Sequence, residues 1–269
     1  MDDGETIQLE HWIYGASPEK GYGTKAESHL LNGPLYARYL GSHFTPVRVE
    51  KTTSGMTVID ARMIHPAPAN DEVLLSVLGR GAADEYNRPT IANHTVVVPA
   101  PALRSGRLTL EMAEAAIGEF DKRYPKATGK IDPVVVHLRP AEESSDSKGT
   151  GIRRLITKAA VETLVSRLLH EPQGRTLILC RDSTHEYRNE LLYKLVELVL
   201  SGSEIPLFTA ISDAPTLSAM NHFRLAISTR GVRADATWTL LDASIDRPAL
   251  GPVRGRAPIY ARVAEAFAE

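Results

Sequence analysis

The sequence predicts a mixed α/β fold, with a β-rich N-terminal half and a βαβαβ C-terminal half. Apolar runs in the first hundred residues are short, rich in β-branched side chains and bounded by Gly, Pro, Asn or Ser. From residue 133 onward, strand-like and helix-like runs alternate. The halves 1–130 and 131–269 are expected either to form two domains or to share one continuous mixed sheet in a single integrated domain.

Four strands, a glycine loop and one long helix are expected in the first half. The strands are Ile7–Tyr14, Met56–Ile64, Glu72–Leu78 and His94–Pro99. Leu35–Leu40 is expected to form a short helix. The long helix follows Thr109, a suitable N-cap, and ends before Pro125, with Leu110, Ala113, Ile117 and Phe120 on one apolar stripe.

The second half begins with the βαβαβ alternation. The expected order is strand Pro133–Leu138, helix Gly151–His170, strand Arg175–Cys180, helix Glu186–Leu200 and strand Ile205–Ile211. A helix at Asp213–His222, a returning strand pair at Phe223–Thr229 and Ala236–Asp242, and a proline-rich tail with a short last helix are expected to follow.

Composition indicates which partner classes to expect. The chain has 269 residues, 43% of them hydrophobic, and a net charge of −2, so no strong positive field attracts nucleic acid or anionic lipid. The acidic start resembles no signal peptide, and no apolar run reaches the length of a bilayer span. The nine histidines are scattered and Cys180 is the only cysteine, so we expect neither a metal site nor a cofactor. We expect a cytoplasmic protein.

A glycine-rich segment near the N-terminus is the first candidate ligand site. Gly15, Gly21 and Gly23 could present backbone amides to an anion beside Lys25, although no complete phosphate-binding fingerprint occurs. His94 opens a later apolar strand and could help to orient a ligand. The candidate ligand-binding residues are Tyr14, Gly21, Gly23, Lys25, Ser28 and His94. The alternative is that these glycines only shape a turn.

A second candidate site surrounds the single cysteine. Cys180 ends a predicted strand, where open α/β sheets commonly place reactive groups, and Asp182 and His185 follow it closely. A Cys/His hydrolase would need His185 to activate the thiol. The alternative, which we favour, is a buried structural thiol.

Several motifs, taken in order, resemble the N-terminal domain of bacterial GTPase-associated adaptor proteins of NTP-dependent defence systems. They are His11–Gly15, Gly21–Gly23, Lys25–Ser28, Asn93–Pro99, the leucine-rich helix Leu191–Leu200 and the strand Ile205–Thr209. At the end of that helix the family's Leu-Pro pair is replaced by Leu200-Ser201-Gly202. The resemblance implies an α/β adaptor scaffold and supplies no catalytic residues.

The leading functional hypothesis is therefore a non-enzymatic interaction module, either an adaptor for a protein partner or a self-assembling subunit. The first alternative is a small-ligand or nucleotide-binding protein that uses the Gly15–Ser28 segment. The second alternative is a hydrolase built on Cys180, His185 and Asp182.

Overall fold

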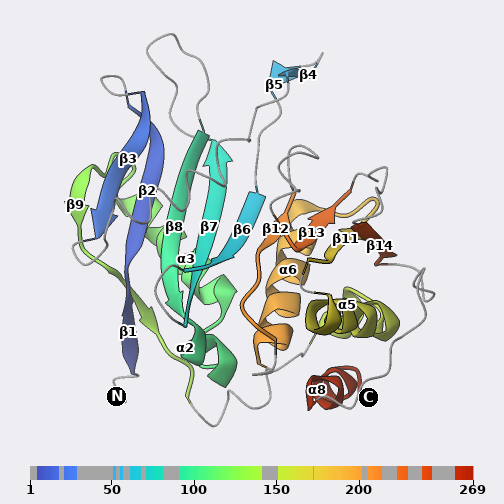
Figure 1. Cartoon of the computed structure of the whole chain (residues 1–269). Coiled ribbons are helices and arrows are strands. Elements are labelled where there is room, and N and C mark those ends of the chain that lie inside the picture. The colour runs from blue at the N-terminus through green and yellow to red at the C-terminus, as the bar shows by residue number, and fades with distance from the viewer. Residues whose placement is uncertain are drawn as a thin grey trace.

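The computed structural model describes residues 5–17, 21–28, 51–52, 55–56, 61–67, 71–80, 91–140, 151–171, 173–201, 205–213, 223–229, 238–243 and 258–268. Ten strands form one mixed sheet in the order β14-β11-β13-β12-β6-β7-β8-β2-β3-β9, and two short two-stranded sheets pair β1 with β10 and β4 with β5 (Figure 1). This confirms the predicted α/β class.

The strands are β1 Thr6–Leu9, β2 His11–Ser17, β3 Gly21–Ser28, β4 Lys51–Thr52, β5 Gly55–Met56, β6 Ala61–Pro66, β7 Glu72–Arg80, β8 Ile91–Pro99, β9 Gly129–Ile131, β10 Val134–His137, β11 Arg175–Leu179, β12 Ala210–Ser212, β13 Leu225–Ser228 and β14 Trp238–Asp242. The helices are α2 Ala100–Ser105, α3 Leu110–Arg123, the 3-10 turn η1 Ile152–Arg154, α5 Lys158–His170, α6 His185–Leu200 and α8 Pro258–Ala266.

The ten-stranded sheet joins both halves of the chain. From β12 to β3 the neighbouring strands run antiparallel, whereas β14, β11, β13 and β12 run parallel to one another. The junction is the antiparallel pair β6–β12, in which Met63 lies opposite Ile211. One mixed sheet therefore runs through both halves of the chain, which is one of the two arrangements that the sequence left open.

Two details of the expected C-terminal topology are wrong. The strand expected at Pro133–Leu138 exists as β10, but it pairs antiparallel with β1 outside the ten-stranded sheet. The expected strand pair at 223–229 and 236–242 exists as β13 and β14, which lie on opposite sides of β11 and parallel to it. Strand patterns do not encode pairing partners, because each buried strand accepts any neighbour that completes its hydrogen bonds.

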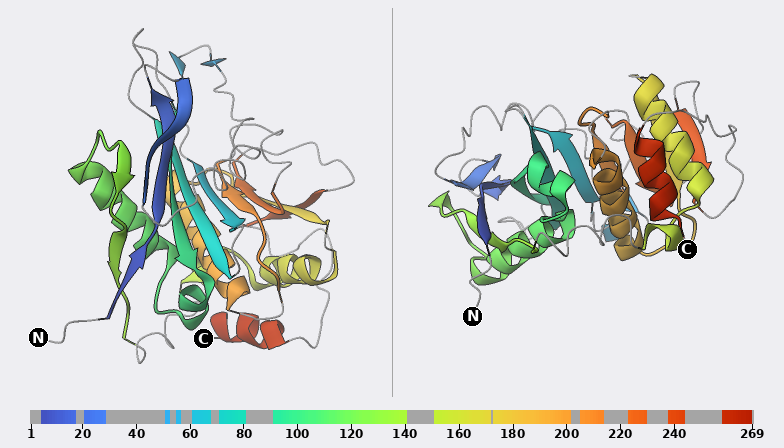
Figure 2. Two further views of the ribbon diagram at one scale, coloured as in Figure 1. Left: turned by 60° about the vertical axis from the view of Figure 1, so that its left-hand side comes forward. Right: turned by 90° about the horizontal axis from the view of Figure 1, so that it is seen from below.

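The helices cover the sheet as a connected layer. α2 and α3 pack near β7 and β8, α6 packs against β12 and β13, and α5 packs against β11. α6 also contacts α2, α3 and α8, so these helices share one layer (Figure 2). Alternate strand residues point away from this layer, and Met63, Leu177 and Ala226 belong to a second buried cluster.

The predicted glycine loop is mostly a β-hairpin. β2 continues through Gly15 to Ser17, β3 begins at Gly21, and Gly15 lies opposite Gly23 in their antiparallel pairing. Two expected helices, Leu35–Leu40 and most of Asp213–His222, lie outside the described residues. Within the described part of the chain, no helix combines the length and the apolar character needed to cross a bilayer.

Candidate functional site

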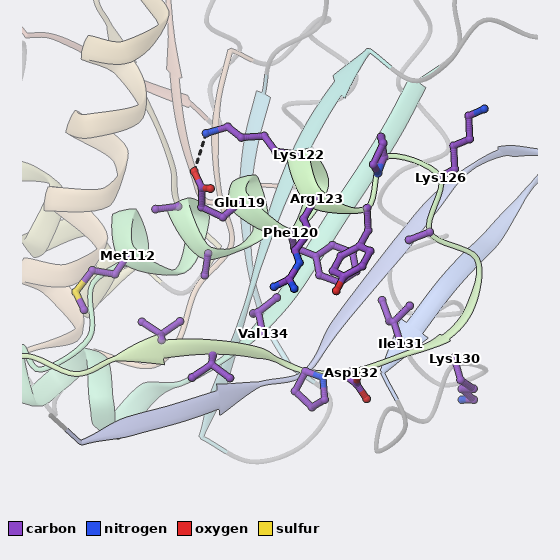
Figure 3. A pocket seen from close by; sticks show the side chains of 18 of the residues that line it. Met112, Glu119, Phe120, Lys122, Arg123, Lys126, Lys130, Ile131, Asp132 and Val134 are labelled. Atoms are coloured by element: carbon purple, nitrogen blue, oxygen red, sulfur yellow. Dashed lines mark hydrogen bonds and ion pairs between the residues drawn. The ribbon is translucent and has the colours of Figure 1, made fainter. Parts of the chain in front are cut away.

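A groove of about 1380 Å³ lies beside α3. One wall is the exposed side of α3 from Met112 to Arg123, and the chain then turns through 124–128 and returns along the helix as β9 and β10. Figure 3 shows Phe120 and Val134 pointing into the space between these walls. We call this space the α3–β10 groove.

Polar contacts to the rest of the fold anchor the helical wall. The Thr109 hydroxyl caps α3 by accepting a hydrogen bond from the Met112 amide at 3.2 Å. On its inner side, Glu114 accepts a hydrogen bond from Arg62 Nε at 2.7 Å and another from the Tyr193 hydroxyl at 2.6 Å. Because Arg62 lies on β6 and Tyr193 on α6, this carboxylate ties α3 to both the sheet and the neighbouring helix.

The other wall is a strand with one free edge. The Leu138 amide donates to the Glu5 carbonyl at 2.8 Å, so the amides of alternate β10 residues point toward β1. The amides of Val135 and His137 point the opposite way, and no described residue accepts a hydrogen bond from them. Every residue from Lys130 to His137 lines the groove, which therefore follows β9 and β10 along their length.

The groove is apolar inside. It contains Tyr124 and Val135, which are the exposed large hydrophobic side chains among the described residues, at 47% and 55% exposure. The Phe120 and Tyr124 rings pack together with centroids 4.9 Å apart. Apolar residues gathered at one exposed place are typical of a binding surface, whereas scattered ones are not.

The rim of the groove is predominantly basic. Its charged side chains are Lys122, Arg123, Lys126, Lys130, Glu119 and Asp132. Glu119 pairs with Lys122 at 2.6 Å, and Lys130 pairs with Glu27, outside the groove, at 2.7 Å. The exposed Lys126 ammonium has no ion-pair partner among the described residues. Cations exceed anions here even though the whole chain carries a net charge of −2.

A buried pair of histidines lies beneath the groove. His11 Nδ1 lies 2.7 Å from His94 Nε2, and His94 Nδ1 lies 2.9 Å from Asp121 Oδ1. His11 Nε2 lies 2.8 Å from the carbonyl oxygen of Asp132, a groove residue. The Phe120 ring stands edge-on to both imidazoles, with centroids 4.5 Å from His11 and 5.8 Å from His94.

The partners and the burial of His11 fix its protonation state. Because the Asp132 carbonyl can only accept a hydrogen bond, His11 Nε2 donates in that contact. Burial lowers the pKa of His11 from 6.5 to about 4, so His11 is neutral near pH 7 and its Nδ1 carries no proton.

The candidate ligand-binding residues are only partly brought together. The Ser28 hydroxyl accepts a hydrogen bond from the His11 amide at 2.9 Å, so His11 links Ser28 to His94. The other candidates, Tyr14, Gly21, Gly23 and Lys25, lie along the β2–β3 hairpin. Their nucleotide-binding role stays a prediction.

The Cys180 group has the geometry of a structural site. Burial raises the pKa of the Cys180 thiol to about 12, which leaves it protonated at neutral pH. His185 Nδ1 lies 2.7 Å from Asp213 Oδ2, and both contact the buried Arg188 guanidinium, so His185 is held by other partners. Cys180 and Asp182 line a small cavity of about 420 Å³ that does not include His185.

Sequence reasoning missed the α3–β10 groove, although some of its signals were present. The run Val134-Val135-Val136 follows a segment rich in basic residues, 122–130, and this combination favours an apolar surface with a cationic rim. His11 was not among the candidate site residues, because only the fold brings it against His94. The described residues contain no cluster of side chains suited to a metal ion.

No protein-family model matches this chain, and a comparison with curated proteins finds no significant match.

Proposed function

We propose that this chain is a non-enzymatic protein-interaction module whose docking surface is the α3–β10 groove. The observation that carries the proposal is that Tyr124 and Val135, the exposed large hydrophobic side chains among the described residues, both line this groove together with basic residues. Aromatic side chains in an apolar centre with a polar rim are characteristic of protein interfaces.

The state of the reactive side chains supports an interaction role over a catalytic one. The Cys180 thiol is buried and protonated, and His185 is engaged by Asp213. The His11 and His94 rings are 0% and 5% exposed, and their nitrogens contact one another, Asp121 and the Asp132 carbonyl. In the proposed function, these side chains have a structural role and not a catalytic one.

The proposed occupant is a segment of a different protein. The cationic rim would repel the same rim on a second copy, which disfavours self-association through this groove. The resemblance to GTPase-associated adaptors makes the NTPase of a cytoplasmic defence assembly the first partner to test. Self-assembly, the other form of the interaction hypothesis, is an outcome that the experiment below separates.

The test compares two matched variants with the wild-type chain. Val135→Asp introduces a charge at an exposed apolar position that lines the groove, and Lys158→Asp introduces one at an exposed position of α5, outside the groove. A partner retrieved from the native host is purified, and its dissociation constant for each variant is measured by titration calorimetry.

The proposal predicts that Val135→Asp weakens binding at least about tenfold, whereas Lys158→Asp binds like wild type. Equal binding by all three proteins would refute the groove as the docking surface. Light scattering over a concentration series gives the oligomeric state, and a stable oligomer abolished by Val135→Asp would replace the partner with a second copy.

A further inference from the structure

We infer that the α3–β10 groove binds an extended, acidic segment of its partner as a third strand on the β1–β10 sheet. The inference rests on the proposed function, because it specifies what the docking surface recognises. It is carried by three features of the groove: the free edge of β10, the apolar interior and the cationic rim.

The free edge defines both the place and the length of the added strand. The Val135 and His137 amides face away from β1, and their carbonyl groups point the same way, as they do in any strand. Pro133 lacks an amide hydrogen, and the Arg139 amide already donates to the Arg107 carbonyl at 2.9 Å. The edge available to a partner is therefore the four-residue strand β10.

The free edge of β10 suits an added strand. Such a strand would lie about 4.8 Å from β10, on the side away from β1. Its side chains would alternate between the face of the sheet to which Val134 belongs, toward the groove and Phe120, and the solvent-exposed face to which Val135 belongs. Insertion of an extended peptide beside a sheet edge is an established mode of recognition, in which backbone hydrogen bonds supply affinity and side-chain pockets supply specificity.

The charge of the rim specifies the composition of the segment. Lys126 and Lys130 lie at the end of the groove where the loop enters β9 (Figure 3). Lys126 is exposed without an ion-pair partner among the described residues, and Lys130 pairs with Glu27, which an acidic side chain of the partner could displace. Acidic residues at this end of the segment would complement both ammonium groups.

The first experiment uses a display library of random heptapeptides, selected on the full chain. We expect the selected peptides to combine β-branched or aromatic residues at alternate positions with Asp or Glu at one end. The double variant Lys126→Glu, Lys130→Glu should bind them roughly fivefold to tenfold more weakly, with a reduced salt dependence.

The second experiment measures amide hydrogen exchange by NMR, with and without a selected peptide. The amides of Val136 and Leu138 face β1 and should be protected in both states. The amides of Val135 and His137 should exchange quickly in the free protein and become protected when the peptide binds. This pattern identifies strand addition independently of any mutation.

A pair of variants then tests the backbone contact. Val135→Pro removes the free amide at a position where the β1 ladder does not use it, whereas Val135→Thr keeps the amide and the β-branched shape. The proline variant should lose about tenfold in peptide affinity and the threonine variant little, and thermal melting checks that both fold.

The outcomes separate this inference from the proposed function. Peptides whose binding is blocked by Tyr124→Asp, but which leave the Val135 and His137 amides unprotected, would refute strand addition while keeping the groove as the docking surface. Failure to select any peptide, or selection of basic ones, would also overturn the inference. Binding that Tyr124→Asp leaves unchanged would overturn both.

Discussion

Replacing His11 by glutamine should remove part of the dependence of stability on pH. Burial lowers the pKa of folded His11 from its ordinary value of 6.5 to about 4. The unfolded chain therefore binds a proton at higher pH than the folded one, so the stabilisation by neutral His11 is present above 6.5 and lost as pH falls toward 4. Protonation of His11 would also place a hydrogen on Nδ1, the atom that lies 2.7 Å from His94 Nε2.

The size of the effect follows from the two pKa values. Near pH 5 almost every unfolded molecule carries a proton on this ring, but only about a tenth of folded molecules do. Between about pH 7.5 and about pH 5, His11 alone should therefore reduce the free energy of unfolding by about 2 kcal/mol. The glutamine in the His11→Gln variant does not titrate, and its amide can still donate to the Asp132 carbonyl and accept from His94.

Urea unfolding at the two pH values measures this difference directly. The drop in free energy of unfolding should be about 2 kcal/mol smaller in the His11→Gln variant than in the wild type. His137→Gln, which replaces an exposed histidine, is the matched control and should keep the wild-type drop. An equal drop in the His11 variant would refute the assignment of His11 as a buried neutral ring.

Three further predictions follow from buried polar groups. The Cys180 thiol, whose pKa burial raises to about 12, should react with iodoacetamide near neutral pH only after the protein unfolds, as mass spectrometry would report. Glu197 accepts a hydrogen bond from the Leu110 amide, and burial raises its pKa from 4.5 to about 7, so the stability it favours at low pH is lost as pH rises through that range. Glu197→Gln should consequently raise the urea midpoint above about pH 7 and leave it nearly unchanged near pH 4. Arg188→Met should lower the free energy of unfolding by roughly 3 kcal/mol or more, because it leaves the largely buried Asp213 carboxylate without its cation. A loss below about 1 kcal/mol would show that Arg188 and Asp213 contribute no more than a surface ion pair.

Local sequence patterns predicted most elements because local physics decides them. The apolar stripe behind Thr109 became α3 with that cap, and the apolar run Val96–Val98 became part of a strand buried on both faces. The pairing of strands that are distant in the sequence was harder to predict. β10 pairs with β1 outside the main sheet. Hydrogen bonding between strands more than a hundred residues apart leaves no local sequence pattern that would predict this pairing.

The distinction between local patterns and long-range contacts also explains which residues of the candidate sites could be predicted. The glycines of the β2–β3 hairpin predict a loop, because glycine signals a turn more often than a strand interior. The position of His94 marks it as a candidate, but its partners His11 and Asp121 come from β2 and α3 and meet only in the folded chain. The groove has no equivalent local signal, because a free strand edge is a property of topology.

Photo-crosslinking from inside the groove tests whether the α3–β10 groove is the docking surface. A benzophenone-bearing residue replaces Tyr124 in the full chain, and a second protein carries it at Lys158 on α5, outside the groove. After irradiation in the native host, position 124 should yield one discrete crosslinked partner and position 158 none. Crosslinks at position 158 with none at position 124 would show that partners bind elsewhere and would refute the groove as the docking surface.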